Sequence, residues 1–275
     1  MGPREAPLCE CLVLSTIHQN RSSSPTKQFA RTPREILSFV SSVWDPLGFV
    51  SPFAVRGRVF LQELWPLKLD WDHVVDEERL QVWAKFEQEA RSLDELTFPR
   101  CYRRQKEVAN DFQLHVFSDS SVKAKSTVAY YRFMYESDNV DVTLISARTR
   151  VTPLKKQTIP RLEFDALRMG VNLATIISEE SDIEVKRVVF WTDSTICKYW
   201  LTQTSRRYKD YVVHRIVDFL EKTNLLHRKA LLVRYISSEM NAVDIGTRGA
   251  ILKDLDFDSA WQRGLNFLCK PKRMA

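Results

Sequence analysis

Four acidic residues stand at positions from which folding could bring them together. Asp119 and Asp193 each end an apolar stretch typical of a strand, Glu163 is expected in the first turn of a long helix, and Asp244 closes the stretch from Asn241. Sites in α/β sheets form at strand ends. Mg²⁺ prefers oxygen ligands, and two such ions roughly 4 Å apart can activate water and stabilise a leaving oxygen. Together the acids suit metal-assisted phosphodiester hydrolysis, whereas each alone is more typical of a helix cap.

The elements expected to hold these acids form a mixed α/β domain. The predicted order is three strands in a meander, a helix, a strand, two helices, a strand and a short helix near Glu239. Ser194 can cap the helix after the fourth strand. The strands are expected over residues 113–118, 127–134, 140–147, 187–192 and 231–236, and the longer helices over about 162–178 and 207–225. This order predicts strands packed against flanking helices.

A smaller, mainly helical module is expected ahead of this domain. Thr32 and Pro33 are typical of a helix start, and Asp45-Pro46-Leu47-Gly48 is typical of a turn. Further helices are expected over about 52–67 and 77–93. The predicted divisions are a disordered arm over 1–30, the helical module over 31–108, the α/β domain over 109–250 and a C-terminal tail over 251–275.

Composition excludes several classes of protein. Of the 275 residues, 44% are hydrophobic and 28% are charged, which argues against a disordered or collagen-like chain. The net charge of +6 permits a polyanionic partner without requiring one. The apolar window over 36–55 contains Asp45 and Pro46, so a membrane span and a membrane partner are not expected. Five scattered cysteines indicate reduced thiols and an intracellular, cytoplasmic setting.

Several motifs, taken in order, resemble the polyprotein of BEL/Pao retrotransposons over residues 31–268. They are Asp45-Pro46-Leu47-Gly48, Leu61-Gln62-Glu63-Leu64-Trp65, Trp71-Asp72, Thr158-Ile159-Pro160-Arg161-Leu162-Glu163, Trp191-Thr192-Asp193-Ser194, the run from Asn241 to Gly249, and Trp261 with Gly264 and Phe267-Leu268. Each motif alone is weak, but their order is specific.

The resemblance implies a connection segment followed by a ribonuclease H-like five-stranded mixed sheet. It carries the family's active-site acids onto Asp119, Glu163, Asp193 and Asp244. These acids would hold two Mg²⁺ or Mn²⁺ ions and cleave the RNA strand of an RNA–DNA hybrid. Implied partners are the hybrid itself and the reverse transcriptase part of a parent polyprotein.

Basic and small polar residues beside the acids are candidates for substrate binding. The first basic group lies before Glu163 and the second lies further along the chain; they comprise Arg148, Arg150, Lys155, Lys156 and Arg161, then Arg206, Arg207 and Lys209. Such groups can bind phosphates, although a solvated face is an equally good interpretation. Ser120, Ser194 and Asn241 are placed to reach a ribose 2′-hydroxyl, which distinguishes RNA from DNA.

Alternatives to a nuclease stay open. The chain has Ser120, Ser126 and Ala242 where the family usually has Ala, Gly and Pro. The retained acids favour a nuclease, whereas Ser120 and Ser126 favour a decayed or repurposed remnant that binds nucleic acid without cleaving it. The family region also carries a peptidase label, but Asp119-Ser120-Ser121 and Asp193-Ser194-Thr195 lack the Gly of an aspartic protease. Neither a Tyr-x-Asp-Asp polymerase motif nor a His-His-Cys-Cys zinc module is present.

Overall fold

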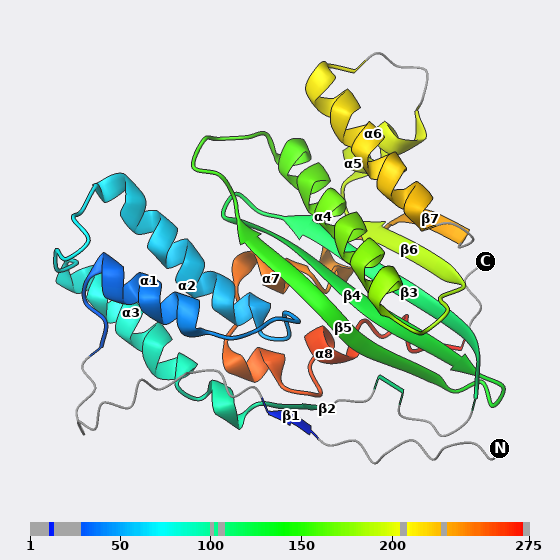
Figure 1. Cartoon of the computed structure of the whole chain (residues 1–275), viewed down its shortest axis with the longest axis horizontal. Coiled ribbons are helices and arrows are strands. Elements are labelled where there is room, and N and C mark those ends of the chain that lie inside the picture. Colours follow the sequence, from blue (N-terminus) through cyan, green and yellow to red (C-terminus); the bar gives the residue numbers. More distant parts are fainter. Residues whose placement is uncertain are drawn as a thin grey trace.

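The computed structural model describes residues 11–13, 29–99, 102–103, 108–203, 208–226 and 230–271 (Figure 1). Its centre is a five-stranded mixed sheet. In spatial order β5-β4-β3-β6-β7, the strands are β5 (Val140–Val151), β4 (Ala124–Tyr135), β3 (Ala109–Ser120), β6 (Arg187–Thr192) and β7 (Ala230–Tyr235). The first three form an antiparallel meander, and β6 and β7 run parallel to β3. The predicted mixed sheet with flanking helices is confirmed.

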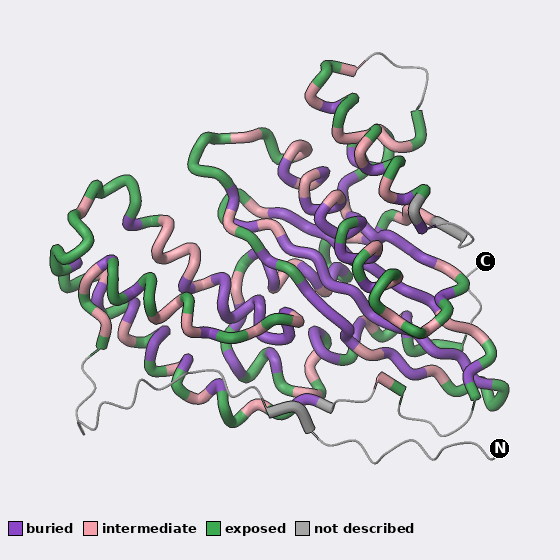
Figure 2. Tube along the Cα trace, viewed as in Figure 1, coloured by how far each residue is buried: buried purple, intermediate pink, exposed green. Residues whose placement is uncertain are grey.

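Both faces of the sheet are covered, so its strands are buried along most of their length (Figure 2). The long helix α4 (Ile159–Glu180) packs on β3 and β4, and α6 (Asp210–Leu225) packs on α4 (Figure 1). Between β6 and α6 lies α5 (Thr195–Thr202). Phe164, Phe190 and Phe219 form part of the core on this face. The prediction that a helix follows the three-stranded meander and precedes β6 is therefore confirmed.

The helical module covers the other face. Its helices are α1 (Pro33–Ser42), α2 (Ser51–Leu64), the short η1 (Trp65–Leu67), α3 (Glu77–Ala90) and η2 (Leu93–Glu95). Thr32 caps α1 in a capping box with Glu35, as the sequence predicts. Phe53 and Trp83 share one core with Phe117 and Trp191 of the sheet. The boundary predicted at residue 108 thus separates segments that pack together.

The predicted turn before α2 is confirmed, and its carboxylate organises it. The Asp45 side chain accepts hydrogen bonds from the backbone N–H groups of Phe49 and Val50 at 2.8 and 3.0 Å. Gly48 has φ = +83°, and a Cβ there would lie 2.0 Å from the carbonyl oxygen of Ala147 on β5. Glycine is required here both by the left-handed backbone and by this close approach.

The C-terminal segment, which includes the predicted tail over 251–275, packs against the sheet. It contains η3 (Ser238–Met240), α7 (Asp244–Arg248), η4 (Leu252–Leu255) and α8 (Ala260–Arg263). Trp261 is buried and donates to the carbonyl oxygen of Phe49, while Tyr130 donates to the carbonyl oxygen of Trp261 at 2.7 Å. Arg132, fully buried on β4, donates to the carbonyl oxygens of Leu268 and Lys270 at 2.7 and 2.8 Å.

The predicted arm over 1–30 lies almost entirely outside the described residues. Its described parts are 29–30 and β1 (Cys11–Val13), which pairs antiparallel with β2 (Thr97–Pro99). Over the described ranges, every helix is too short or too polar to span a lipid bilayer.

Candidate active site

Two of the four predicted acids lie side by side because the strands that carry them are parallel neighbours. In the register of β3 and β6, Ser118 lies opposite Thr192, and Asp119 and Asp193 follow directly. Asp119 is buried, with 8% of its surface exposed. Asp193 accepts a hydrogen bond from the Ser238 hydroxyl at 2.8 Å. Both carboxylates therefore stand at the same end of the sheet.

Glu163 reaches this end of the sheet from α4. The helix starts at Ile159, so Glu163 is its fifth residue and not in the first turn as predicted. The sequence interpretation took Pro160 to precede the helix, whereas proline fits the first helical turn because its missing N–H has no partner there. The Ser194 hydroxyl lies beside Glu163, where it lowers the pKa of that carboxyl against the effect of burial, and it caps α5 by accepting from the N–H of Cys197 at 3.1 Å.

Asp244 is joined to Asp119 through Thr247. The Thr247 hydroxyl oxygen lies 2.9 Å from Oδ2 of Asp119 and 2.9 Å from the carbonyl oxygen of Asp244. The carbonyl oxygen of Thr247 accepts from Ser121, which fixes α7 against the turn after β3. Sequence reasoning missed Thr247; its signal was a threonine three residues after Asp244, one helical turn away. Arg248 pairs with the Asp244 carboxylate at 2.9 Å.

The negative charges at this site affect the pKa values of Asp119 and Glu163. Burial raises the pKa of Asp119 to about 6, and the negative charges of Asp193 and Asp244 add to this against the opposing Thr247 hydrogen bond. Burial also raises the pKa of Glu163, with a further contribution from Asp193. Nearby negative charge disfavours ionisation of Asp119 and Glu163 in the same direction as burial does. A cation placed among them would reverse this effect.

The carboxylate oxygens of the site are suitable ligands for a hard divalent cation, although no three of the described carboxylates are grouped around one position. The buried Oδ1 of Asp193 has no hydrogen-bond partner among the described residues. A buried carboxylate oxygen without a donor is unfavourable, and a cation would satisfy it. Within the described ranges, no three His, Cys, Asp or Glu side chains are grouped closely enough to hold one ion together. Electrostatic interactions link Asp119 with Asp193 and Asp244, and Glu163 with Asp193.

The predicted substrate-binding residues fall into two kinds. Ser120 Oγ and Asn241 Nδ2 are buried and lack hydrogen-bond partners among the described residues, so both atoms could form a hydrogen bond with a ligand. Lys155 and Lys156 are exposed on the loop before α4. Arg161 lies over the ring of Tyr211, 4.1 Å from its centroid. Of the second basic group, Lys209 is described, whereas Arg206 and Arg207 lie outside the described residues. The roles of all these residues stay predictions.

The strand order, the α4 crossover and the carboxylates at one sheet end define a ribonuclease H-like domain. The family model described as "Pao retrotransposon-like RNaseH-like domain" matches residues 32–194, more than half of the chain. The chain therefore belongs to the Pao retrotransposon RNaseH-like family, which confirms the resemblance seen in the sequence. The match includes the helical module and three of the four predicted acids.

Solved structures similar to this chain include two ribonucleases H1 and a foamy viral protease-reverse transcriptase. RNase H1 of the halophilic archaeon Halobacterium salinarum NRC-1 is 12% identical, with a TM-score of 0.33, over 47% of this chain and 89% of that one. LC11-RNase H1 in complex with RNA/DNA hybrid is 12% identical, with a TM-score of 0.36, over 53% and 100%. The foamy viral protease-reverse transcriptase with double-stranded DNA is 14% identical, with a TM-score of 0.41, over 78% and 33%. Among curated proteins, none matches the chain.

Proposed function

We propose that this chain is a metal-dependent ribonuclease that hydrolyses the RNA strand of RNA–DNA hybrids. The observation that carries the proposal is that the parallel strands β3 and β6 bring Asp119 and Asp193 to one sheet end, where Oδ1 of Asp193 has no partner among the described residues. Membership of an RNaseH-like family supports the same reaction class. Buried carboxylates that repel one another are typical of cation sites.

In this proposal Asp119, Glu163, Asp193 and Asp244 hold the divalent ions. When bound, Mg²⁺ or Mn²⁺ would assist attack of water on phosphorus and stabilise the leaving oxygen. The bond to the 3′-oxygen breaks, which leaves a 3′-hydroxyl and a 5′-phosphate. Thr247 orients Asp119, and Ser194 stands beside Glu163. Ser120, Asn241 and Ser194 are the candidates for contact with the ribose 2′-hydroxyl, and Lys155, Lys156 and Arg161 for phosphates.

The decisive test compares the chain with its Asp193→Asn variant on an end-labelled RNA–DNA hybrid. We expect Mg²⁺-dependent cleavage of the RNA strand that EDTA abolishes. Removing one metal-binding carboxylate removes several kcal/mol of transition-state stabilisation, so the variant should lose about 10³-fold or more in rate. Gel analysis of the RNA fragments measures both the rate and the 5′-phosphate end.

A matched control separates loss of chemistry from loss of folding. Asp94→Asn removes one carboxylate from an exposed position on η2, remote from the sheet end in sequence. It should cleave at the rate of the unmodified chain. Equal rates for the Asp193 variant and this control would contradict the proposed active site.

A second function is favoured by one observation. Because the acids meet in pairs and not as a ready group of three, a member of this family that binds hybrids without cleaving them would look similar. Binding of the labelled hybrid with no cleavage in Mg²⁺ or Mn²⁺ would select this alternative. Peptidase activity is not proposed, since neither Asp-Ser segment carries the required glycine.

A further inference from the structure

A polar pocket lies behind the acids, between the sheet edge and the helices that cover it. It has a volume of about 520 Å³ and is lined by β4, β5, α4 and α6. Its charged lining residues are Lys125, Arg148, Arg150, Arg168, Arg215 and one acid, Asp165. Five cations therefore face a single carboxylate.

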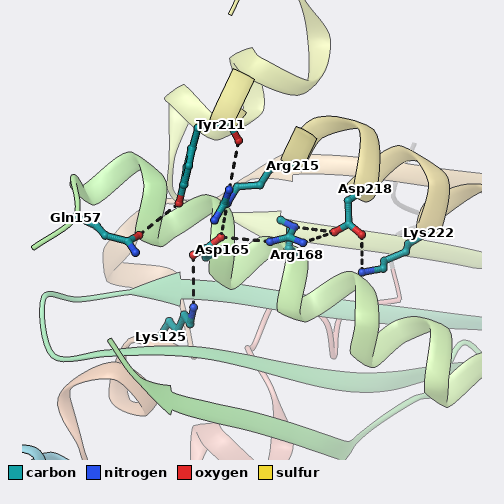
Figure 3. Close-up of polar contacts among 8 residues, drawn as sticks. All are labelled: Lys125, Gln157, Asp165, Arg168, Tyr211, Arg215, Asp218 and Lys222. Atoms are coloured by element: carbon teal, nitrogen blue, oxygen red, sulfur yellow. Dashed lines mark hydrogen bonds and ion pairs between the residues drawn. The ribbon is translucent and has the colours of Figure 1, made fainter. Parts of the chain in front are cut away.

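That carboxylate is already fully engaged (Figure 3). Asp165 lies 2.9 Å from Arg215 Nε, 3.5 Å from Arg168 and 3.6 Å from Lys125 Nζ, and only 11% of its side chain is exposed. Arg168 also pairs with Asp218, at 2.7 Å from its Nε, and Asp218 is shared in turn with Lys222. The acids thus fix the cations in place without neutralising them.

Arg148 and Arg150 add positive charge that has no local counterpart. Both are exposed on the edge strand β5, and the register places Arg150 directly opposite Lys125 on the same face. Like charges directly opposite across two strands are destabilising. Among the described residues, no carboxylate lies within ion-pair distance of either arginine. Two positions along one strand put their Cα atoms about 7 Å apart.

The pocket begins next to the proposed active site. Lys125 lies opposite Ser120 in the register of β3 and β4, directly after Asp119. Glu163 and Asp165 are two residues apart on α4, so they point to different sides of the helix. The acids and the pocket therefore flank α4 at the same end of the sheet, and a nucleic-acid strand bound at the acids could pass from one to the other.

We infer that this pocket binds consecutive phosphates of the substrate backbone away from the cleaved bond. The inference rests on the proposed function and extends it to a second contact region. Arginine presents a planar fork of donors that matches phosphate oxygens, and Arg168 and Arg215 are held ready by Asp165. Arg148 and Arg150 supply the two contacts at the rim. The ligand class is a phosphodiester backbone, read by charge and not by base sequence.

The test measures hybrid binding as a function of salt by fluorescence anisotropy. Binding is measured in the Asp193→Asn background, so that the substrate is not consumed. Arg148→Gln with Arg150→Gln should reduce the slope of log K against log salt by about 2, since each lost phosphate contact contributes about 0.9. At 0.1 M salt the affinity should fall by about tenfold or more.

Two control variants make the result specific. Lys85→Gln with Lys253→Gln removes the same charge from exposed positions on α3 and η4, and should leave the slope unchanged. Arg148→Lys with Arg150→Lys keeps the charge and should retain the slope, which excludes misfolding as the cause. An unchanged slope in the glutamine pair, or an equal loss in both glutamine pairs, would overturn the inference.

Cleavage by the active chain distinguishes this inference from the proposed function. Placed in the active chain, the Arg148 and Arg150 changes should raise KM and leave kcat unchanged. Cleavage that is insensitive to these changes would overturn the pocket and keep the nuclease. An arginine-dependent salt slope without any cleavage would support the pocket and refute the nuclease.

Discussion

The sheet end and the pocket behind it are neighbours with opposite electrostatics. At the sheet end, burial and the negative charge of Asp193 raise the pKa values of Asp119 and Glu163, and a bound cation would offset both effects. In the pocket, five cationic side chains and one carboxylate line the wall, and that carboxylate contacts three of the cations. The two regions meet on α4, where Glu163 and Asp165 are separated by a single residue. A modest net charge of +6 thus conceals two strong local imbalances, and each is suited to a ligand of opposite sign.

The same chemical change should have opposite effects on stability in the two regions. Asp165→Asn leaves Lys125, Arg168 and Arg215 close together without their shared carboxylate. Removing one partner of a largely buried ion pair is strongly destabilising, and we expect a loss of about 2–4 kcal/mol in the free energy of unfolding. Urea denaturation at pH 7 measures it.

The matched control for Asp165 is an exposed ion pair. Asp72→Asn breaks the pair with Arg34, in which both side chains are largely exposed. Exposed pairs contribute little, so this variant should unfold close to the unmodified chain. If Asp165→Asn were as stable as Asp72→Asn, Asp165 would not be needed to stabilise the cluster of Lys125, Arg168 and Arg215.

At the sheet end, Asp119→Asn should stabilise the metal-free protein at pH 7 while it abolishes cleavage. The folded-state pKa of about 6 lies above the unfolded value, so stability from this group is lost as the pH rises from about 4 through 6. Removing the charge should restore about 1–3 kcal/mol at pH 7 in EDTA, and nothing near pH 4.

Denaturation curves at both pH values, with and without Mg²⁺, check the Asp119 prediction. Mg²⁺ should stabilise the unmodified chain more than the variant, because it relieves the same repulsion. Because bound Mg²⁺ favours the ionised carboxylate, cleavage by the unmodified chain should decline only at a pH below the metal-free pKa of about 6. A variant that is less stable at pH 7 than the unmodified chain would contradict this account of the site.

The smallest expected effect concerns Thr247. Thr247→Val keeps the shape of the buried side chain but removes the hydroxyl between Asp119 and Asp244. Loss of one such hydrogen bond is worth about 1 kcal/mol, so kcat should fall about fivefold with KM unchanged. Thr247→Ser should restore the rate. Equal rates for the valine and serine variants would remove Thr247 as a positioning residue.

Local signals made much of the fold predictable. The Thr32 cap and the Asp45 turn depend on a few adjacent residues, and the apolar strands ended where the polar residues began. Asp119 and Asp193 could be paired because parallel neighbours end at the same sheet edge. Long-range contacts were not visible in this way. The grouping of Lys125 with Arg150 depends on strand register, and that of Asp165 with Arg215 on helix packing, which short-range patterns do not specify.

The guanidinium of Arg132 makes the last described residues an integral part of the sheet. Its acceptors are the main-chain oxygens of Leu268 and Lys270, and the Leu268 side chain is itself buried in the core. A version shortened to residue 267 would enclose a permanent positive charge with two of its oxygen acceptors removed, a severe penalty. Any excised fragment meant to fold should therefore extend to at least Lys270, far beyond the last of the acids.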